Sequence, residues 1–174
     1  NDVTIGTAAR IGKLYDDDAV LMQVLRHQGA IPFARTNIPQ TMLSYECSNT
    51  VFGITTNPHN PSKGPGGSSG GEGCLIGGGA SLLGIGTDIG GSSRIPAAFS
   101  GCTGFKPTSK RISKKGCVSS TPGQEGIAGS VGPMAREVDG LALLMRALWA
   151  DGVMNKLDPT VSDPNPNPKP EPEV

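Results

Sequence analysis

The stretch GPGGSSGGEGCLIGGGASLLGIGTDIGGSSRIPAAFSGCTG, residues 64–104, decides how this chain folds. Glycine fills 15 of these 41 positions, and the whole chain has 26 glycines in 174 residues, about twice the usual ~7% share. Inside the stretch, the apolar run 80–85 has the length of a β-strand, while Pro96 can open a helical turn that Gly101 closes. Because apolar residues of this kind are not left in water, the stretch is predicted to be structured rather than a flexible spacer.

Two other uses of glycine-rich sequence find little support. Phosphate-binding loops need G-x-G-x-x-G or G-x-x-x-x-G-K-[ST], and neither pattern occurs between residues 64 and 104. The pattern G-x-S-x-G does occur at 67–71 and would make Ser69 the nucleophile of a Ser-His-Asp triad. In α/β-hydrolases the histidine follows the serine, whereas His27 and His59 both precede it here. Neither interpretation is favoured.

The residues before this stretch predict helix, strand and helix. Three aspartates at 16–18 offer an N-cap, Gly29 suits a helix end, and an apolar helical stripe lies between them at Val20, Leu21, Val24 and Leu25. Residues 30–35 are short and apolar, which predicts a buried strand, and Pro39 is placed to begin a second helix through about residue 46. This alternation predicts an α/β architecture with parallel strands.

The residues after the stretch predict a long helix and then a tail. A lysine-rich loop at 106–115 is followed, between Pro133 and Gly152, by a helical apolar face at Val138, Leu141, Leu144, Met145 and Leu148. From residue 155 the chain is rich in Pro and Asn and has almost nothing apolar to bury. We therefore expect a partial domain at 1–154 and a disordered tail at 155–174.

Charge and cysteine content exclude several classes of function. With 15 basic and 15 acidic residues the formal net charge is zero, which argues against a nucleic-acid surface. The four cysteines form no C-x-x-C pair and lie far from both histidines in sequence, so we expect free thiols, no metal site and no cofactor: Cys47, Cys74, Cys102 and Cys117. No signal peptide opens the chain, and no apolar run approaches the ~20 residues that a membrane span needs.

Several motifs of this chain together resemble the amidase signature family. They are GGSSGG at 66–71, GTDIGGS at 86–92, Arg94 and GFKPT at 104–108, with two serines, Ser68 and Ser92, 24 positions apart as in that family. The resemblance runs from about residue 2 to 159. Two further segments, PQTMLSYECSN at 39–49 and SVGPMAR at 130–136, are similar to the branch of the family that hydrolyses fatty acid amides.

The resemblance implies a part of the amidase signature fold, a mixed and largely parallel sheet flanked by helices, and a role for each site residue. Ser92 would be the nucleophile that becomes acylated, and Ser68, on a cis peptide, would pass a proton between a neutral lysine and Ser92. The oxyanion hole would consist of the backbone N–H groups of Ile89, Gly90, Gly91 and Ser92. Met42 and Leu43 would face the substrate, and the loops would be held by Ser69, Asp88 and Arg94.

The resemblance also marks what this sequence lacks. The family's catalytic lysine lies on a strand upstream of the part that matches Asn1 onward, and its place is not taken by Lys13, Lys63, Lys106 or Lys110. Ser93 stands where a larger apolar residue is common. By resemblance, the parent protein would hydrolyse fatty acid amides on the cytoplasmic face of an internal membrane, as a possible homodimer. The alternatives are the amidase subunit of a tRNA-dependent amidotransferase, and an inactive truncated amidase.

Overall fold

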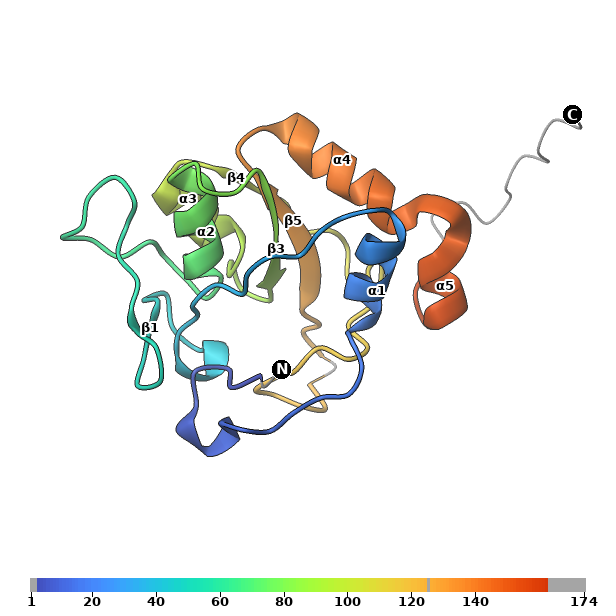
Figure 1. The fold of residues 1–174 in the computed structure, drawn as a ribbon, viewed down its shortest axis with the longest axis horizontal. Coiled ribbons are helices and arrows are strands. Elements are labelled where there is room, and N and C mark those ends of the chain that lie inside the picture. The colour runs from blue at the N-terminus through green and yellow to red at the C-terminus, as the bar shows by residue number, and fades with distance from the viewer. Residues whose placement is uncertain (1–2, 125, 163–174) are drawn as a thin grey trace, which may run out of the picture.

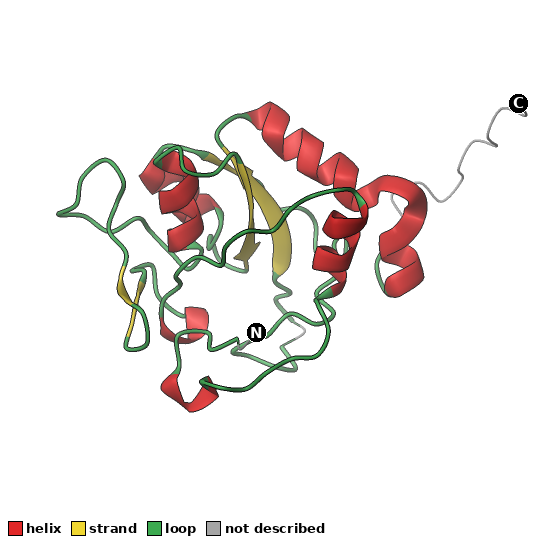
Figure 2. Cartoon of the chain, in the orientation of Figure 1, coloured by secondary structure: helices red, strands yellow, loops and turns green. Residues whose placement is uncertain are grey.

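A three-stranded sheet between helices forms the centre of the computed structural model, which describes residues 3–124 and 126–162. The strand order is β3–β5–β4 (Figures 1 and 2). A separate two-stranded hairpin, β1–β2, lies at the edge of the molecule. The strands are β1 Ser48–Asn49, β2 Gly53–Ile54, β3 Leu83–Asp88, β4 Thr103–Gly104 and β5 Ser130–Ala135. The helices are α1 Val20–His27, α2 Gly70–Gly77, α3 Arg94–Ser100, α4 Val138–Trp149 and α5 Val153–Leu157, with single 3₁₀ turns at Ala8–Arg10, Gln40–Met42 and Ala150–Gly152.

The central strand β5 separates two cores because its side chains alternate between the two faces of the sheet. Val131 packs into the cluster formed by α1, α4 and α5, whereas Met134 packs into a second cluster with Ile76 of α2 and Ala97 of α3. All six residues of β5 are buried. Helices on both faces confirm the predicted α/β class.

The direction of the strands differs from the prediction. β3 pairs with β5 from Leu83↔Ala135 to Asp88↔Ser130, and β4 pairs with the other edge of β5, both antiparallel. Every strand pairing among the described residues is antiparallel, so the parallel arrangement predicted for this part of the chain is wrong. The prediction depended on a strand at 30–35 that does not form.

The predicted and observed secondary structures differ most in segment 30–46. Ile31 is 86% exposed and Phe33 70% exposed, so this apolar run is neither buried nor paired with another described strand. The helix expected at 39–46 is instead a single 3₁₀ turn, Gln40–Met42. Two of its residues, Thr41 and Met42, have positive φ. Two successive left-handed residues end a helix, because each places its Cβ against the following carbonyl.

Helix α1 forms as predicted, with a different N-terminal cap. Its apolar stripe is buried against α4 and α5, and Gly29 has the expected positive φ. Ala19, rather than an aspartate, is the N-cap residue; the Val20 N–H donates to the carbonyl of Lys115 at 3.0 Å. The Asp18 carboxylate instead accepts from Arg26 Nε at 3.0 Å.

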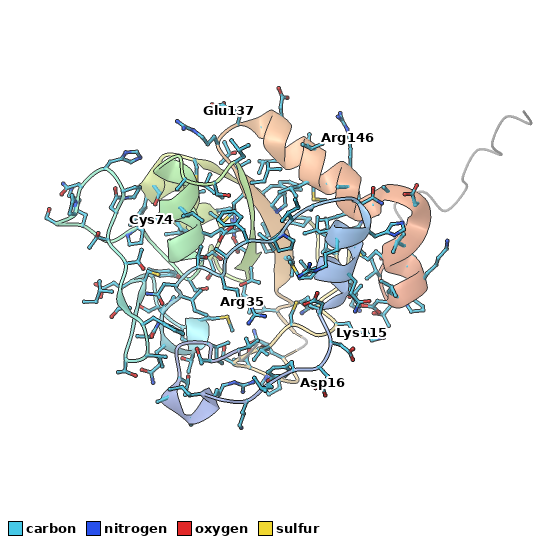
Figure 3. All side chains as sticks on the ribbon, viewed as in Figure 1. Asp16, Arg35, Cys74, Lys115, Glu137 and Arg146 are labelled. Carbon is cyan, nitrogen blue, oxygen red and sulfur yellow. The ribbon has the colours of Figure 1, made fainter. Side chains whose placement is uncertain are left out.

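Helix α4 is confirmed, and the packed structure continues beyond it. Leu144, Met145 and Leu148 are buried, while Glu137 and Arg146 point outward from the helix (Figure 3). The predicted tail begins too early, because residues 155–157 belong to α5 and Val161 is 6% exposed within the core. The rest of the predicted tail, residues 163–174, lies outside the described residues.

Helix α2 was not predicted, since its sequence GGEGCLIG has four glycines, each about 1 kcal/mol less favourable than Ala in a helix. Its glycines allow close contacts instead. A Cβ at Gly73 would lie 2.9 Å from Pro96 Cβ, and a Cβ at Gly77 would overlap the carbonyl oxygen of Ser100. The two helices therefore pack backbone against backbone, and tertiary contact overrides local propensity.

We predict that Gly77→Ala destabilises the protein although alanine is the better helix former. Propensity alone would stabilise the helix by about 1 kcal/mol, whereas overpacking a closed contact costs about 1–3 kcal/mol, so the overlap with Ser100 decides the sign. Urea denaturation should show a lower midpoint. Gly64→Ala, where no atom lies within 4 Å of the added Cβ, is the control and should leave the midpoint nearly unchanged. A raised midpoint for Gly77→Ala would contradict this packing.

Candidate active site

Two loops that each carry a predicted site serine lie against one another. Ser68 ends the loop before α2, and Ser92 lies between β3 and α3. The Ser69 N–H donates to the carbonyl oxygen of Ser92 at 2.9 Å, which joins the loops directly. The Ser69 hydroxyl also accepts from the Thr87 N–H at 3.2 Å. Through its backbone and its hydroxyl, Ser69 therefore links the Ser68 loop both to the Ser92 loop and to β3.

The loop around Ser68 is closely packed on both sides. Ser68 is 2% exposed, and the Gly67–Ser68 peptide is cis, as the family resemblance implied. A Cβ at Gly67 would lie 2.6 Å from the carbonyl oxygen of Ser44, so only glycine fits between this loop and the segment that carries Met42. The backbone before Ser68 is thereby held against the Ser44 segment.

A buried carboxylate holds the loop around Ser92. The side chain of Asp88 is 1% exposed and accepts hydrogen bonds from the Gly91 N–H at 2.7 Å, the Ser93 N–H at 3.1 Å and the Ser93 hydroxyl at 2.9 Å. The Arg94 guanidinium adds Nε at 3.0 Å and a terminal nitrogen at 2.9 Å. Asp88 and Arg94 thus form an ion pair, and Ser93, which stands where an apolar residue is common in the family, provides an extra donor.

The electrostatics of this cluster favour the ionised carboxylate. Burial opposes ionisation of Asp88, but the hydrogen bonds from Arg94, Gly91 and Ser93 outweigh it and hold the pKa of the carboxyl well below its ordinary value. The same contact with Asp88 raises the pKa of Arg94. Asp88 is therefore both the ion-pair partner of Arg94 and the residue that holds the backbone before α3.

The two serines open into one cavity of about 790 Å³. The predicted site residues on its wall are Met42, Leu43, Ser68, Asp88, Ile89, Gly90 and Ser92. The wall also includes the apolar residues Ile127 and Val131 and hydroxyl and amide groups from 119–124. Such a lining offers a ligand both apolar contacts and hydrogen-bonding groups.

One of the four N–H groups predicted for an oxyanion hole already has a hydrogen-bond partner in the structure. The Gly91 N–H donates to Asp88 Oδ1, so it is engaged within the loop, and Gly91 is not on the cavity wall. Ile89, Gly90 and Ser92 do line the cavity. Their N–H groups are the remaining members of the predicted set.

Sequence reasoning missed the segment 114–131, which completes the wall. It contributes Lys114 and Cys117, and burial raises the pKa of the Cys117 thiol against the opposing effect of the Lys114 charge. The turn that carries Lys114 is held in place by a buried hydrogen bond, in which the Ser113 hydroxyl donates to the Asp158 carboxylate. No local pattern could have shown this, since the segment reaches the serines only through the β3–β5 pairing.

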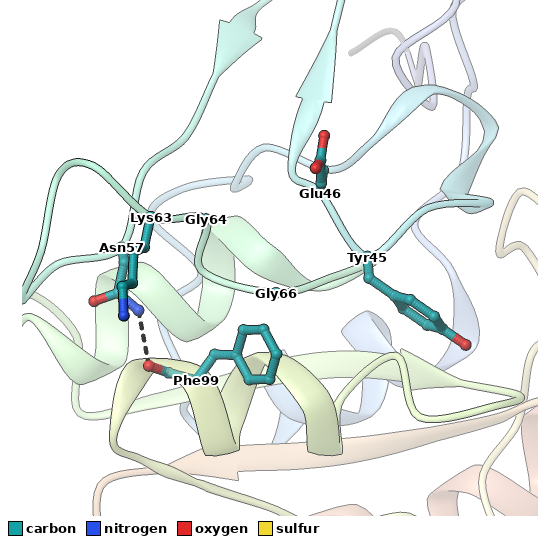
Figure 4. Close-up of a pocket in the computed structure, with 7 residues that line it drawn as sticks. All are labelled: Tyr45, Glu46, Asn57, Lys63, Gly64, Gly66 and Phe99. Atoms are coloured by element: carbon teal, nitrogen blue, oxygen red, sulfur yellow. Dashed lines mark hydrogen bonds between the residues drawn. The ribbon is translucent and has the colours of Figure 1, made fainter.

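A second hollow is lined in part by Gly64 and Gly66, shortly before Ser68 in the chain (Figure 4). It has a volume of about 530 Å³ and is lined by Tyr45, Glu46, Asn57, Lys63, Gly64, Gly66 and Phe99. The Asn57 side chain donates to the Phe99 carbonyl at 2.8 Å and so ties the 57–63 loop to α3. Tyr45 lines both hollows, but neither serine is in this one.

Neither a metal cluster nor a spanning helix was found in the described residues. Within 3–124 and 126–162 there is no group of three or more His, Cys, Asp or Glu side chains that could hold a metal ion. No helix in these same ranges is both long and apolar enough to cross a bilayer.

Comparison with known proteins agrees with this geometry. The model of the family described as Amidase matches residues 1–173. The chain is 56% identical over 161 residues to fatty-acid amide hydrolase 1 of Sus scrofa, covering 92% of this chain and 28% of that protein. A solved fatty acid amide hydrolase superposes with a TM-score of 0.89 at 42% identity, covering 99% of this chain and 29% of that one. A solved glutamyl-tRNA(Gln) amidotransferase subunit from Thermotoga maritima gives a TM-score of 0.78 at 26% identity, covering 85% of this chain and 32% of that one.

The chain therefore belongs to the amidase signature family. It spans less than a third of the length of the porcine relative, at 28%.

We predict that Asp88→Asn lowers stability at neutral pH and weakens its dependence on pH. The pKa of Asp88 is lowered in the folded state, so its contribution is present above the unfolded value of ~3.9 and is lost as the pH falls below that value. Replacing this charged acceptor should reduce the free energy of unfolding by about 1.5–3 kcal/mol.

Urea denaturation from neutral to acidic pH provides the measurement. Asp17→Asn, at an exposed position, is the control and should retain the pH dependence of the unmodified protein. The same acid loss of stability in Asp88→Asn would show that another group is responsible.

Proposed function

We propose that the protein containing this chain is a serine amidase that hydrolyses fatty acid amides to a fatty acid and an amine. The observation that carries the proposal is the meeting of Ser68 and Ser92, from two loops, at the wall of one cavity with an apolar side. The similarity to fatty acid amide hydrolases supports the choice of substrate.

The proposed reaction begins at Ser92. Its oxygen attacks the amide carbonyl carbon while its proton passes through Ser68 to a neutral lysine, giving a tetrahedral intermediate. The N–H groups of Ile89, Gly90 and Ser92 would stabilise the oxyanion, with the loop already fixed by Asp88. The lysine then returns the proton through Ser68 to the amine, the C–N bond breaks, and water hydrolyses the acyl-enzyme.

The base in this scheme is assigned upstream of Asn1 by resemblance. Within the cavity wall, Lys114 is the single lysine among the described residues and is the alternative proton acceptor. Lys114 is exposed, whereas a neutral lysine base needs a desolvated position, so the upstream lysine is the favoured assignment.

The shape of the cavity supports an acyl chain rather than a small amide. Met42, Leu43 and Ile127 offer apolar surface on the wall of the cavity that contains Ser92, and burial of each CH₂ group contributes about 0.8 kcal/mol. The hydroxyl-rich side at 119–124 would face the polar end of the substrate. Membrane association and dimerisation of the parent protein follow only from the resemblance and stay predictions.

Covalent labelling of the complete protein tests the nucleophile. A fluorophosphonate probe should label Ser92, Ser92→Ala should abolish labelling, and Ser68→Ala should slow it by about 10²-fold or more because proton transfer is interrupted. Lys114→Met should leave the rate unchanged if the base lies upstream. Undiminished labelling of Ser92→Ala would refute the assignment.

Substrate comparison separates the two amidase classes. A fatty acid amide hydrolase should turn over oleamide in preference to glutamine, while an amidotransferase subunit would prefer glutamine and need a partner. The Met42–Leu43 segment and Ile89 on the cavity wall favour the lipid amide.

The 174-residue chain by itself tests the third possibility, an inactive truncation. Assayed against a version extended upstream through the lysine, the shorter chain should be much slower with oleamide, since Ser68 lacks its proton acceptor. Equal activity of the two would contradict the proposed mechanism.

A further inference from the structure

Ile89 and Gly129 face each other one step beyond the last pair of the β3–β5 ladder. The ladder ends at Asp88↔Ser130, so the register places Ile89 directly opposite Gly129. Cross-strand partners project to the same face of a sheet, and this face also carries Thr87 and Val131, another pair in register. All four of these residues line the cavity that contains Ser92.

Gly129 leaves a gap in this surface that the Ile89 side chain fills. A Cβ at position 129 would lie 2.7 Å from Ile89 Cγ1 and 3.3 Å from its Cδ1. Real Cβ atoms do not come that close, and Cγ1 of a β-branched residue cannot move without a change of rotamer or backbone. Ile89 is 45% exposed and lies on the cavity wall, so the cavity is the space open to a displaced side chain.

We infer that Gly129 is a specificity-determining residue: by leaving room for the Ile89 side chain, it keeps the cavity beside Ser92 wide enough for a long acyl chain. The inference rests on the proposed amidase function and extends it to the width of the acyl site. A larger residue at 129 pushes Ile89 toward the acyl chain and selects for short amides.

The position of the contact limits its effect to the first carbons of the substrate. Ile89 lines the same cavity as Ser92, three residues before it, and its N–H belongs to the proposed oxyanion set, so an acyl chain held there would leave the carbonyl near Ile89. A short amide can avoid a displaced Ile89, whereas a long chain has to pass it to reach apolar wall residues such as Ile127.

The test is the ratio of kcat/KM for oleamide to that for butyramide, measured in the complete protein. Gly129→Ala should lower this ratio about tenfold or more, the size of effect that a methylene-scale change in a pocket produces. Because both substrates are measured on one preparation, the ratio does not depend on the fraction of folded protein.

Gly126→Ala is the matched control. It adds the same methyl group to the same segment, but no atom lies within 4 Å of its Cβ position, and Gly126 is not on the cavity wall. Its ratio should equal that of the unmodified protein.

A second variant tests the contact itself. Ile89→Ala removes both atoms that the new Cβ would strike, so Gly129→Ala combined with Ile89→Ala should regain the ratio of Ile89→Ala alone. A ratio still lowered in the double variant would overturn the inference.

The remaining outcomes separate the inference from the proposed function. An unchanged ratio in Gly129→Ala, or an equal loss for both amides, would overturn the inference and leave the amidase function standing. If the unmodified protein hydrolyses neither amide and the fluorophosphonate does not label Ser92, the proposed function fails and the inference fails with it.

Discussion

The buried Asp88 carboxylate is the constraint on which the rest of the site depends. It ends β3 and binds Gly91 and Ser93 of the following loop and Arg94, the first residue of α3, within six positions of the chain. An ionised carboxylate this deeply buried is tolerated only with such a set of donors, so the loop cannot change shape without leaving the charge unpaired. The position of Ser92 is a consequence of satisfying Asp88.

Glycine provides the second constraint, that of close approach between backbones. α2 packs on α3 and the Ser68 loop packs on the Ser44 segment at distances that exclude a side chain. Each glycine makes α2 about 1 kcal/mol less favourable as a helix than alanine would. The close contact with α3 that the glycines allow fixes the loop that precedes α2. Ser68 and Ser92 then meet because both loops are bound to the same pair of helices and to each other through Ser69.

The cavity depends on long-range pairing in a way that the serine loops do not. Its wall includes paired positions of β3 and β5, and these two strands are more than forty residues apart in the sequence. The segment before β5 therefore brings Ile127, Gly129 and the hydroxyl-rich residues to the nucleophile only after the sheet has formed. The same segment also brings Lys114 and Cys117 to the cavity wall.

The sequence alone determined the elements whose signals are local. Amphipathic spacing specified α1 and α4, and Gly101 specified the end of α3. The motifs around Ser68, Asp88 and Ser92 predicted residues that meet at one cavity. Tertiary structure decided the antiparallel strand pairing, the formation of the glycine-rich α2 and the exposure of 30–35. It also decided the hydrogen bond between Gly91 and Asp88 and the part of the cavity wall that segment 114–131 provides. The physical reason is that each of these depends on contacts between distant segments, whose energies exceed local propensity and leave no periodic pattern in the chain.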